Sequence, residues 1–197
     1  MSWLIIGVIL VAAFGPIFWM VPSASDRRLA KMRARARKHG VQIEMTQLDD
    51  LNAEASARVT AGGVRRDPKV SVAAYRLALR RLARAAPRWK ILRRPAANDG
   101  PLPDWQWETA PSGDADYWKQ VANVVSQLPS DALALAADAS EVSCWWRERV
   151  SAQDAVGSVD HLYELLRKLS EIQTLADESA AAAEAAEDAA EPPSKRH

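Results

Sequence analysis

Very few side chains in this sequence have the type and spacing that covalent chemistry requires. Cys144 is the only cysteine, so neither an intrachain disulfide nor a thiolate metal cluster can form. The histidines are scattered, and His161 has no second ligand at metal-binding spacing. Cys144 lies in an apolar run, where cysteine is more often a small buried side chain than a nucleophile. We therefore expect no enzymatic activity, no cofactor and no metal site.

A phosphate-binding loop is also missing from the sequence. Gly62 and Gly63 are adjacent, but their flanks match neither G-x-x-x-x-G-K-[ST] nor G-x-G-x-x-G, so we expect a plain turn there. Carboxylates are plentiful, and the sequence alone does not show whether two of them meet in a pocket. A membrane-tethered enzyme of unknown reaction therefore stays open as an alternative to a non-catalytic protein.

The N-terminal segment has the length and composition of a membrane-spanning helix. Residues Trp3–Val21 carry no formal charge, and 11 of these 19 are Leu, Ile, Val or Phe. As a helix they extend about 28 Å, close to the ~30 Å hydrocarbon core of a bilayer. Trp3 and Trp19 stand near the two ends, where indole rings favour the headgroup region. We expect residues 1–22 to be a transmembrane anchor.

The residues around this segment predict its orientation. Only Met1 and Ser2 precede it, so the basic n-region of a cleavable signal is missing. A group of positive charges follows it, which favours the cytoplasmic side. These basic residues are Arg27, Arg28, Lys31, Arg33, Arg35, Arg37 and Lys38. The expected location is a bacterial inner membrane, single-pass, with a periplasmic N-terminus and a cytoplasmic C-terminal domain.

Residues 23–40 form a predicted basic juxtamembrane helix. Ser25 is a suitable N-cap, and His39-Gly40 is a suitable C-terminal stop. The apolar stripe is narrow, and the basic side chains occupy most of the remaining helix surface. With Trp3 and Trp19, they make up the predicted membrane-interface site, in contact with the lipid bilayer and its anionic headgroups. The alternative is that these charges only enforce the topology.

Charge is distributed very unevenly along the chain. Residues 1–100 contain 19 basic and 7 acidic side chains, whereas residues 101–197 contain 7 basic and 18 acidic ones. Such asymmetry predicts an anionic surface near the first half, either a membrane or nucleic acid. Attraction between the two halves, within one fold or between copies, is the alternative.

Residues 41–175 have the pattern of a small α+β domain. Helices are predicted at Asp114–Leu128 and after Ser151, where apolar side chains recur at helical spacing. Residues 176–197 are a low-complexity Ala/Glu tail whose order stays open. The predicted strands are residues 41–48, 88–94 and 105–109, and two short strands around a turn at Asp138–Ser140. The fold class is thus a single N-terminal transmembrane helix followed by a small cytosolic α+β domain, a short antiparallel sheet with packed helices.

One stretch of this domain is ambiguous. Val70–Leu77 fits a strand or the start of an amphipathic helix, and we expect a strand that becomes a short helix near Leu79–Ala86. Eight basic residues between Arg76 and Arg94, with Trp89 among them, make nucleic acid an alternative partner. No recognisable nucleic-acid-binding motif supports that alternative, and a solvated or membrane-facing surface is commoner for such a patch.

Tryptophans supply the candidate partner surface. Trp105 and Trp107 are two residues apart in a predicted strand and share one of its faces. Trp145 and Trp146 are adjacent in another strand, so alternation sends only one of them to the core. Because tryptophan is enriched at protein interfaces, we expect one of Trp145 and Trp146 to provide an exposed aromatic contact.

Residues 1–70 resemble a known family. An anchor with its N-terminus outside, a basic segment directly after it, and the sequence VTAGGV are similar to YajC-type accessory subunits of the bacterial preprotein translocase. Members of that family carry V-T-x-G-G-[IVL] in a small cytosolic β domain behind one span. The matching residues here are Val59, Thr60, Gly62, Gly63 and Val64. The resemblance implies an accessory role beside a protein-conducting or insertase complex, with no chemistry of its own.

These features together predict an accessory or adaptor protein. We expect a single-pass inner-membrane protein that presents a cytosolic protein-interaction domain to translocase or insertase subunits. A membrane-tethered enzyme and a nucleic-acid-binding membrane protein are the alternatives.

Overall fold

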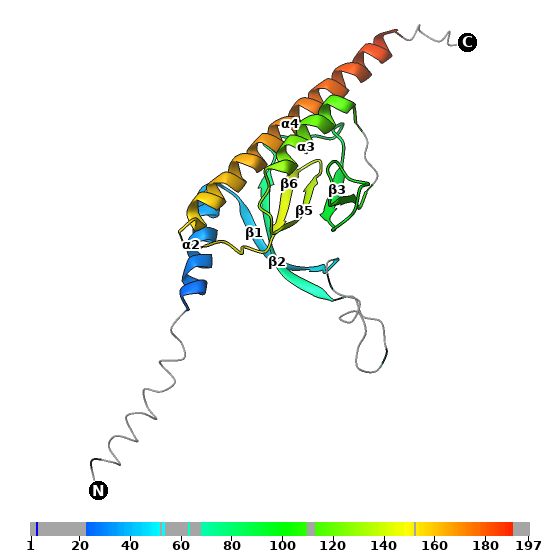
Figure 1. Cartoon of the computed structure of the whole chain (residues 1–197). Helices are drawn as coiled ribbons and strands as arrows, with labels where there is room; N and C mark the ends of the chain where they lie inside the picture. Colours follow the sequence, from blue (N-terminus) through cyan, green and yellow to red (C-terminus); the bar gives the residue numbers. More distant parts are fainter. Residues whose placement is uncertain are drawn as a thin grey trace.

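An antiparallel sheet and its helices make up the fold (Figure 1). The computed structural model describes Trp3, residues 23–51, Ala53, Gly63, and residues 68–109, 113–151 and 153–190. The helices are α2 (Ala24–Lys38), α3 (Ala115–Ser126) and α4 (Ala155–Ala190). The strands are β1 (Gln42–Asp49), β2 (Lys69–Ala78), β3 (Trp89–Arg93), β4 (Trp105–Trp107), β5 (Ala132–Ala137) and β6 (Glu141–Trp146).

All neighbouring strands of the sheet are antiparallel, in the order β1-β2-β6-β5-β3-β4. One row of paired residues crosses the whole sheet on the side that the helices cover. It consists of Ile43, Tyr75, Cys144, Leu135, Ile91 and Trp107. Because side chains alternate between faces along a strand, the residues next to this row point to the opposite face.

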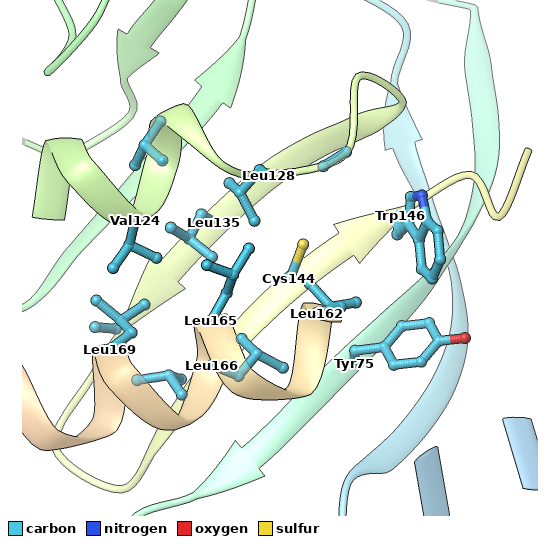
Figure 2. Close-up of a cluster of buried hydrophobic side chains, with 14 of the residues drawn as sticks. Tyr75, Val124, Leu128, Leu135, Cys144, Trp146, Leu162, Leu165, Leu166 and Leu169 are labelled. Atoms are coloured by element: carbon cyan, nitrogen blue, oxygen red, sulfur yellow. The ribbon is translucent and has the colours of Figure 1, made fainter. Parts of the chain in front are cut away.

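The hydrophobic core lies between this face of the sheet and helices α3 and α4 (Figure 2). Leucines at helical spacing along α4 meet the sheet residues Leu135 and Cys144, and Val124 of α3 closes the layer. The α4 leucines are Leu162, Leu165, Leu166 and Leu169, each at most 1% exposed. This apolar stripe is the reason that α4 lies along the sheet.

A chain of buried hydrogen bonds joins β3, α3 and α4. Trp89 Nε1–H donates to the Tyr117 hydroxyl at 2.6 Å, and that hydroxyl donates to Gln173 Oε1 at 2.7 Å. The Gln173 amide nitrogen donates to the Pro87 carbonyl at 2.7 Å, so this fully buried side chain is satisfied. Burial raises the pKa of Tyr117 to about 12. The hydroxyl therefore stays protonated and can donate its hydrogen bond.

Glu148 fastens α2 to the sheet through a buried ion pair. Arg33 donates from Nε to Oε1 at 3.1 Å and from Nη2 to Oε2, and the Tyr75 hydroxyl donates to Oε1 at 2.7 Å. Glu148 is 4% exposed and has a left-handed backbone with φ of 57°. A non-glycine residue keeps that conformation only where its surroundings hold it, and these three bonds hold it here.

Asp160 forms a second clamp, between α2 and α4. Arg35 Nε donates to Oδ1 at 2.7 Å and its Nη2 to Oδ2 at 3.0 Å, and His39 Nε2 lies 2.8 Å from Oδ1. The His39 ring stacks on Tyr163 of α4, with centroids 4.2 Å apart. The hydrogen bonds from Arg35 are the main cause that lowers the pKa of Asp160 below its usual value.

Ion pairs between the two halves of the chain account for much of the charge asymmetry. Both α2 clamps join a basic residue of the first half to an acidic residue of the second. Arg76–Glu141, Arg81–Glu178 and Lys90–Glu108 do the same, each at 2.6 Å. Attraction within the fold therefore explains part of the pattern.

The predicted fold class is corrected by this structure. In place of a membrane-spanning helix with a short sheet, the described residues form a six-stranded antiparallel sheet with three helices. No helix among these residues is long and apolar enough to cross a membrane. The physical reason is charge: α2 is only 15 residues long and strongly basic, and charged side chains occupy the sides of α4 outside its apolar stripe. The expectations of a transmembrane protein and of a single-pass inner-membrane location are therefore wrong for the described chain.

The predicted anchor itself, apart from Trp3, lies outside the described residues. Two smaller expectations also change. The N-cap of α2 is Ser23 rather than Ser25, because Asp26 completes a capping box with Ser23. Residues 79–88 form no helix after β2, and Ala83 N–H is held by the Ala139 carbonyl at 2.8 Å instead. At the other end, α4 continues to Ala190 through much of the Ala/Glu segment.

Removing the charge of Glu148 tests the α2–sheet clamp. We expect Glu148→Gln to lower the free energy of unfolding by about 3 kcal/mol, the low end for breaking a buried pair, because Arg33 is still 24% exposed. Urea unfolding measures this change. Glu164, which forms an exposed ion pair with Arg167, provides the control, and Glu164→Gln should leave stability nearly unchanged. Equal stability of the Glu148→Gln and wild-type proteins would contradict the clamp.

The Asp160 clamp predicts a particular dependence of stability on pH. The pKa of Asp160 is lower in the folded chain than in the unfolded one. The contribution of this carboxylate to the free energy of unfolding is therefore fully present when the pH is above the unfolded pKa. It is lost as pH falls through the folded pKa. Unfolding measured from about pH 5 down to about pH 3 should show the stability gap between wild type and Asp160→Asn closing. A gap that stays constant over this range would refute the assignment.

Candidate interaction surface

The face of the sheet opposite α3 and α4 is uncovered within the part of the chain that the structure describes. Figure 1 shows these helices on one side of the sheet. A second row of paired residues crosses the uncovered face, adjacent to the core row. It consists of Glu44, Ala74, Trp145, Ala134, Leu92 and Gln106. Trp145 is the one large aromatic side chain of this row and stands at its centre.

Trp145 is partly exposed and is flanked by two cations. The Arg76 guanidinium carbon lies 5.9 Å and the Lys90 ammonium 5.2 Å from the centre of its ring system, within the range of cation–π attraction. Both cations are themselves held, Arg76 by Glu141 at 2.6 Å and Lys90 by Glu108 at 2.6 Å. The indole is therefore positioned before any ligand arrives, which lowers the entropy lost on binding.

A hollow of about 340 Å³ opens beside Trp145, which we call the Trp145 groove. Its floor is formed by small side chains of β5 and β6, Ala136 and Ser143, which leave room above the sheet. The full lining is Arg76, Arg88, Trp89, Lys90, Thr109, Ala136, Ala137, Asp138, Glu141, Ser143 and Trp145. The lining contains three basic side chains, Arg76, Arg88 and Lys90, and two acidic ones, Asp138 and Glu141, so its net charge is small.

A second hollow of about 330 Å³ lies farther along the sheet, and Lys90 lines both. Its apolar lining includes Leu48, Leu92 and Leu133. Leu133 reaches this place because β5 has a bulge between Ala132 and Ala134, which shifts the alternation. Simple strand alternation would put Leu133 and Leu135 on one side of the sheet, and the bulge separates them. The two hollows together give the uncovered face an elongated shape.

The structure separates the four tryptophans of the predicted partner surface. Trp146 is fully buried and donates from Nε1 to Asp131 Oδ1 at 2.6 Å. Trp105 is 3% exposed, with the Arg93 guanidinium 4.6 Å from its ring centre. Trp107 packs edge-to-face on Trp118 at 4.7 Å. These three stabilise the fold, whereas Trp145 is the member of the set on the uncovered face.

Alternation along the strands could have located the neighbours of Trp145, but not their pairing. Arg76 and Lys90 occupy positions of β2 and β3 that point away from the core, as the polar members of alternating runs do. What places both beside Trp145 is the strand order, in which β6 and β5 lie between β2 and β3. That order depends on contacts far apart in the sequence.

The predicted membrane-interface residues also fall into separate groups. Arg33 and Arg35 point inward to Glu148 and Asp160, and Arg28 donates to Ser25 Oγ at 3.2 Å. Trp3 is exposed, and Trp19 lies outside the described residues. The basic residues exposed to solvent on α2 are Arg27, Lys31, Arg37 and Lys38.

The cysteine and histidine side chains that could take part in chemistry are buried or already have partners within the fold. Cys144 is fully buried, and burial raises the pKa of its thiol to about 12, so the thiolate is disfavoured. His39 and Asp160 meet across 121 positions of sequence, a pair that spacing did not reveal, but Arg35 holds the same carboxylate. His161 Nε2 lies 3.0 Å from the Gln127 carbonyl. Within the described residues, no group of three or more metal-ligating side chains could hold an ion.

The segment that resembles the translocase subunits, Val59–Val64, lies outside the described residues except for Gly63. Gly63 has a positive φ of 76°, as a turn glycine does.

Comparisons with known proteins do not assign this chain to a family. No protein-family model and no curated protein matches it. Among solved structures, the crystal structure of the mycobacterial trehalose monomycolate transport factor A, TtfA, is 13% identical in sequence, with a TM-score of 0.34. The match covers 71% of this chain and 94% of that one. At that score the likeness assigns neither a fold nor a function to the present chain.

Proposed function

We propose that this chain is a non-catalytic accessory or adaptor protein that binds a segment of a partner protein on the uncovered face of its sheet. The observation that carries the proposal is the partly exposed Trp145, held between Arg76 and Lys90 beside an open groove. Tryptophan anchors of this kind dominate the energy of many protein interfaces. Beside it, the partly exposed side chains of Leu48, Leu92 and Ala136 are available for a partner to pack on.

The shape of the surface favours an extended segment as its ligand. Two hollows of similar size lie along the sheet with Lys90 lining both, so a ligand that filled both would be longer than it is wide. Arg76 and Lys90 are neutralised by their carboxylate partners. A strongly anionic ligand such as RNA would have to displace these carboxylates, so an extended peptide with apolar side chains fits better.

The finer form of the proposal places the partner in a preprotein translocase or insertase. Its support is the sequence resemblance at Val59–Val64. Under this form, the chain contributes binding and no chemistry of its own, which agrees with the burial of Cys144.

Replacing Trp145 tests the proposed function. Tagged full-length wild type, Trp145→Ala and Leu175→Ala are expressed in the native cell, crosslinked and purified, and the bound proteins are quantified by mass spectrometry. Leu175 is the matched control, an apolar side chain 59% exposed on α4. We expect Trp145→Ala to lower recovery of a specific partner by about tenfold or more and Leu175→Ala to leave it unchanged.

Thermal unfolding of both variants verifies that Trp145→Ala is still folded. Recovery of the same partner by folded Trp145→Ala, or of the wild-type chain alone after crosslinking, would refute a binding role for this face. Translocase subunits among the proteins lost from Trp145→Ala would support the finer form, and their absence would exclude it.

A further inference from the structure

Helix α2 has a second, distinct surface on the side away from the fold. Its inner flank buries Met32 and Ala36 against the core and directs Arg33 and Arg35 into the two clamps. Its outer flank carries Arg27, Lys31 and Lys38, which recur four and seven residues apart and therefore lie on one side of the helix. Arg37 lies about 100° around the helix from Lys38, at the other edge of the same exposed side, and we call these four the α2 basic stripe.

The stripe is unneutralised in the described structure. All four side chains are exposed, and none forms an ion pair with another described residue. This contrasts with Arg33 and Arg35 of the same helix, which are paired with Glu148 after β6 and with Asp160 of α4. Four free cations on one helix raise the local positive potential, and this potential attracts anionic ligands.

We propose that the α2 basic stripe docks on an anionic lipid surface. Between the cations stand the small exposed residues Ala30 and Ala34, so the flank presents a row of charges without bulky side chains. Such a row can lie against phosphate headgroups, where each Lys or Arg strengthens binding by about fivefold. Nucleic acid fits less well, because no aromatic side chain stands on this flank to stack on bases.

The position of α2 in the molecule is consistent with such docking. Figure 1 places α2 at one end of the fold and the C-terminal end of α4 at the other. The exposed acidic residues Glu178 and Glu184 belong to that far part of α4. A lipid surface under α2 therefore meets positive charge, while the acidic end of α4 lies at the other end of the fold. The contact is interfacial and needs no helix that crosses a bilayer.

Vesicle binding of the full chain tests the proposal. Partition coefficients are measured by co-sedimentation with vesicles of phosphatidylcholine alone and of phosphatidylcholine with phosphatidylglycerol. The ratio of these two partition coefficients measures the effect of lipid charge. The test variant is Arg27→Gln, Lys31→Gln, Arg37→Gln and Lys38→Gln together. Arg33 and Arg35 are retained, because their replacement would open the clamps.

The control carries the same change of net charge at exposed basic residues away from α2. It combines Arg80→Gln, Arg84→Gln, Arg149→Gln and Lys168→Gln. We expect the wild type and the control to prefer anionic vesicles, the preference to weaken in high salt, and the α2 variant to lose about tenfold or more of it. Thermal unfolding confirms that both variants are folded.

Four results would overturn the proposal. The first is a wild-type chain with no preference for anionic vesicles, and the second is an α2 variant that retains the preference. The third is an equal loss in the control, which would make net charge rather than the stripe responsible. A single-stranded RNA oligonucleotide is tested in parallel, and tighter binding to RNA than to anionic vesicles, abolished in the α2 variant, would also overturn the lipid assignment.

Discussion

The arrangement of the molecule depends on one buried carboxylate, Glu148. It stands directly after β6, in a strained backbone conformation, and accepts hydrogen bonds from Arg33 of α2 and from Tyr75 of β2. An ion pair removed from water is stable only when its remaining hydrogen-bonding capacity is satisfied, and Tyr75 satisfies it here. The same contact thus positions α2 against the sheet and anchors the chain just after Trp145 and Trp146.

From this arrangement the molecule obtains two surfaces of different character. The uncovered face of the sheet is apolar at its centre and balanced in charge, with Trp145 held by Arg76 and Lys90. The outer flank of α2 is positive and has no balancing carboxylates among the described residues. The two proposed ligands, a partner segment and an anionic surface, would not compete, because the two candidate sites lie on different elements and differ in charge and hydrophobicity.

Much of the secondary structure follows from local pattern. Alternation predicted β1, β3 and the β5–β6 pair, and helical spacing predicted α3 and α4, because these signals act over a few residues. The failures have tertiary causes. A helix was predicted near Leu79–Ala86 from helical spacing, yet these residues form none, and the Ala83 N–H donates to the Ala139 carbonyl across the fold. Leu133 and Leu135 are two residues apart in β5, yet a bulge that depends on strand pairing puts them on different sides of the sheet. The membrane-spanning helix predicted from residues 3–21 has no counterpart among the described helices.

In the candidate site, the sequence determines some features and the tertiary structure determines others. The sequence by itself determined that Trp145 and Trp146 face opposite sides of a strand, since alternation is a property of the extended backbone. It also determined that the chain's charge is split between its halves. Only the tertiary structure decided that Trp146 enters the core, that Arg76 and Lys90 flank Trp145, and that Arg33 and Arg35 turn inward while Arg27 and Lys31 do not. These outcomes depend on which strands pair and which helix face is buried, and contacts between distant residues make that choice.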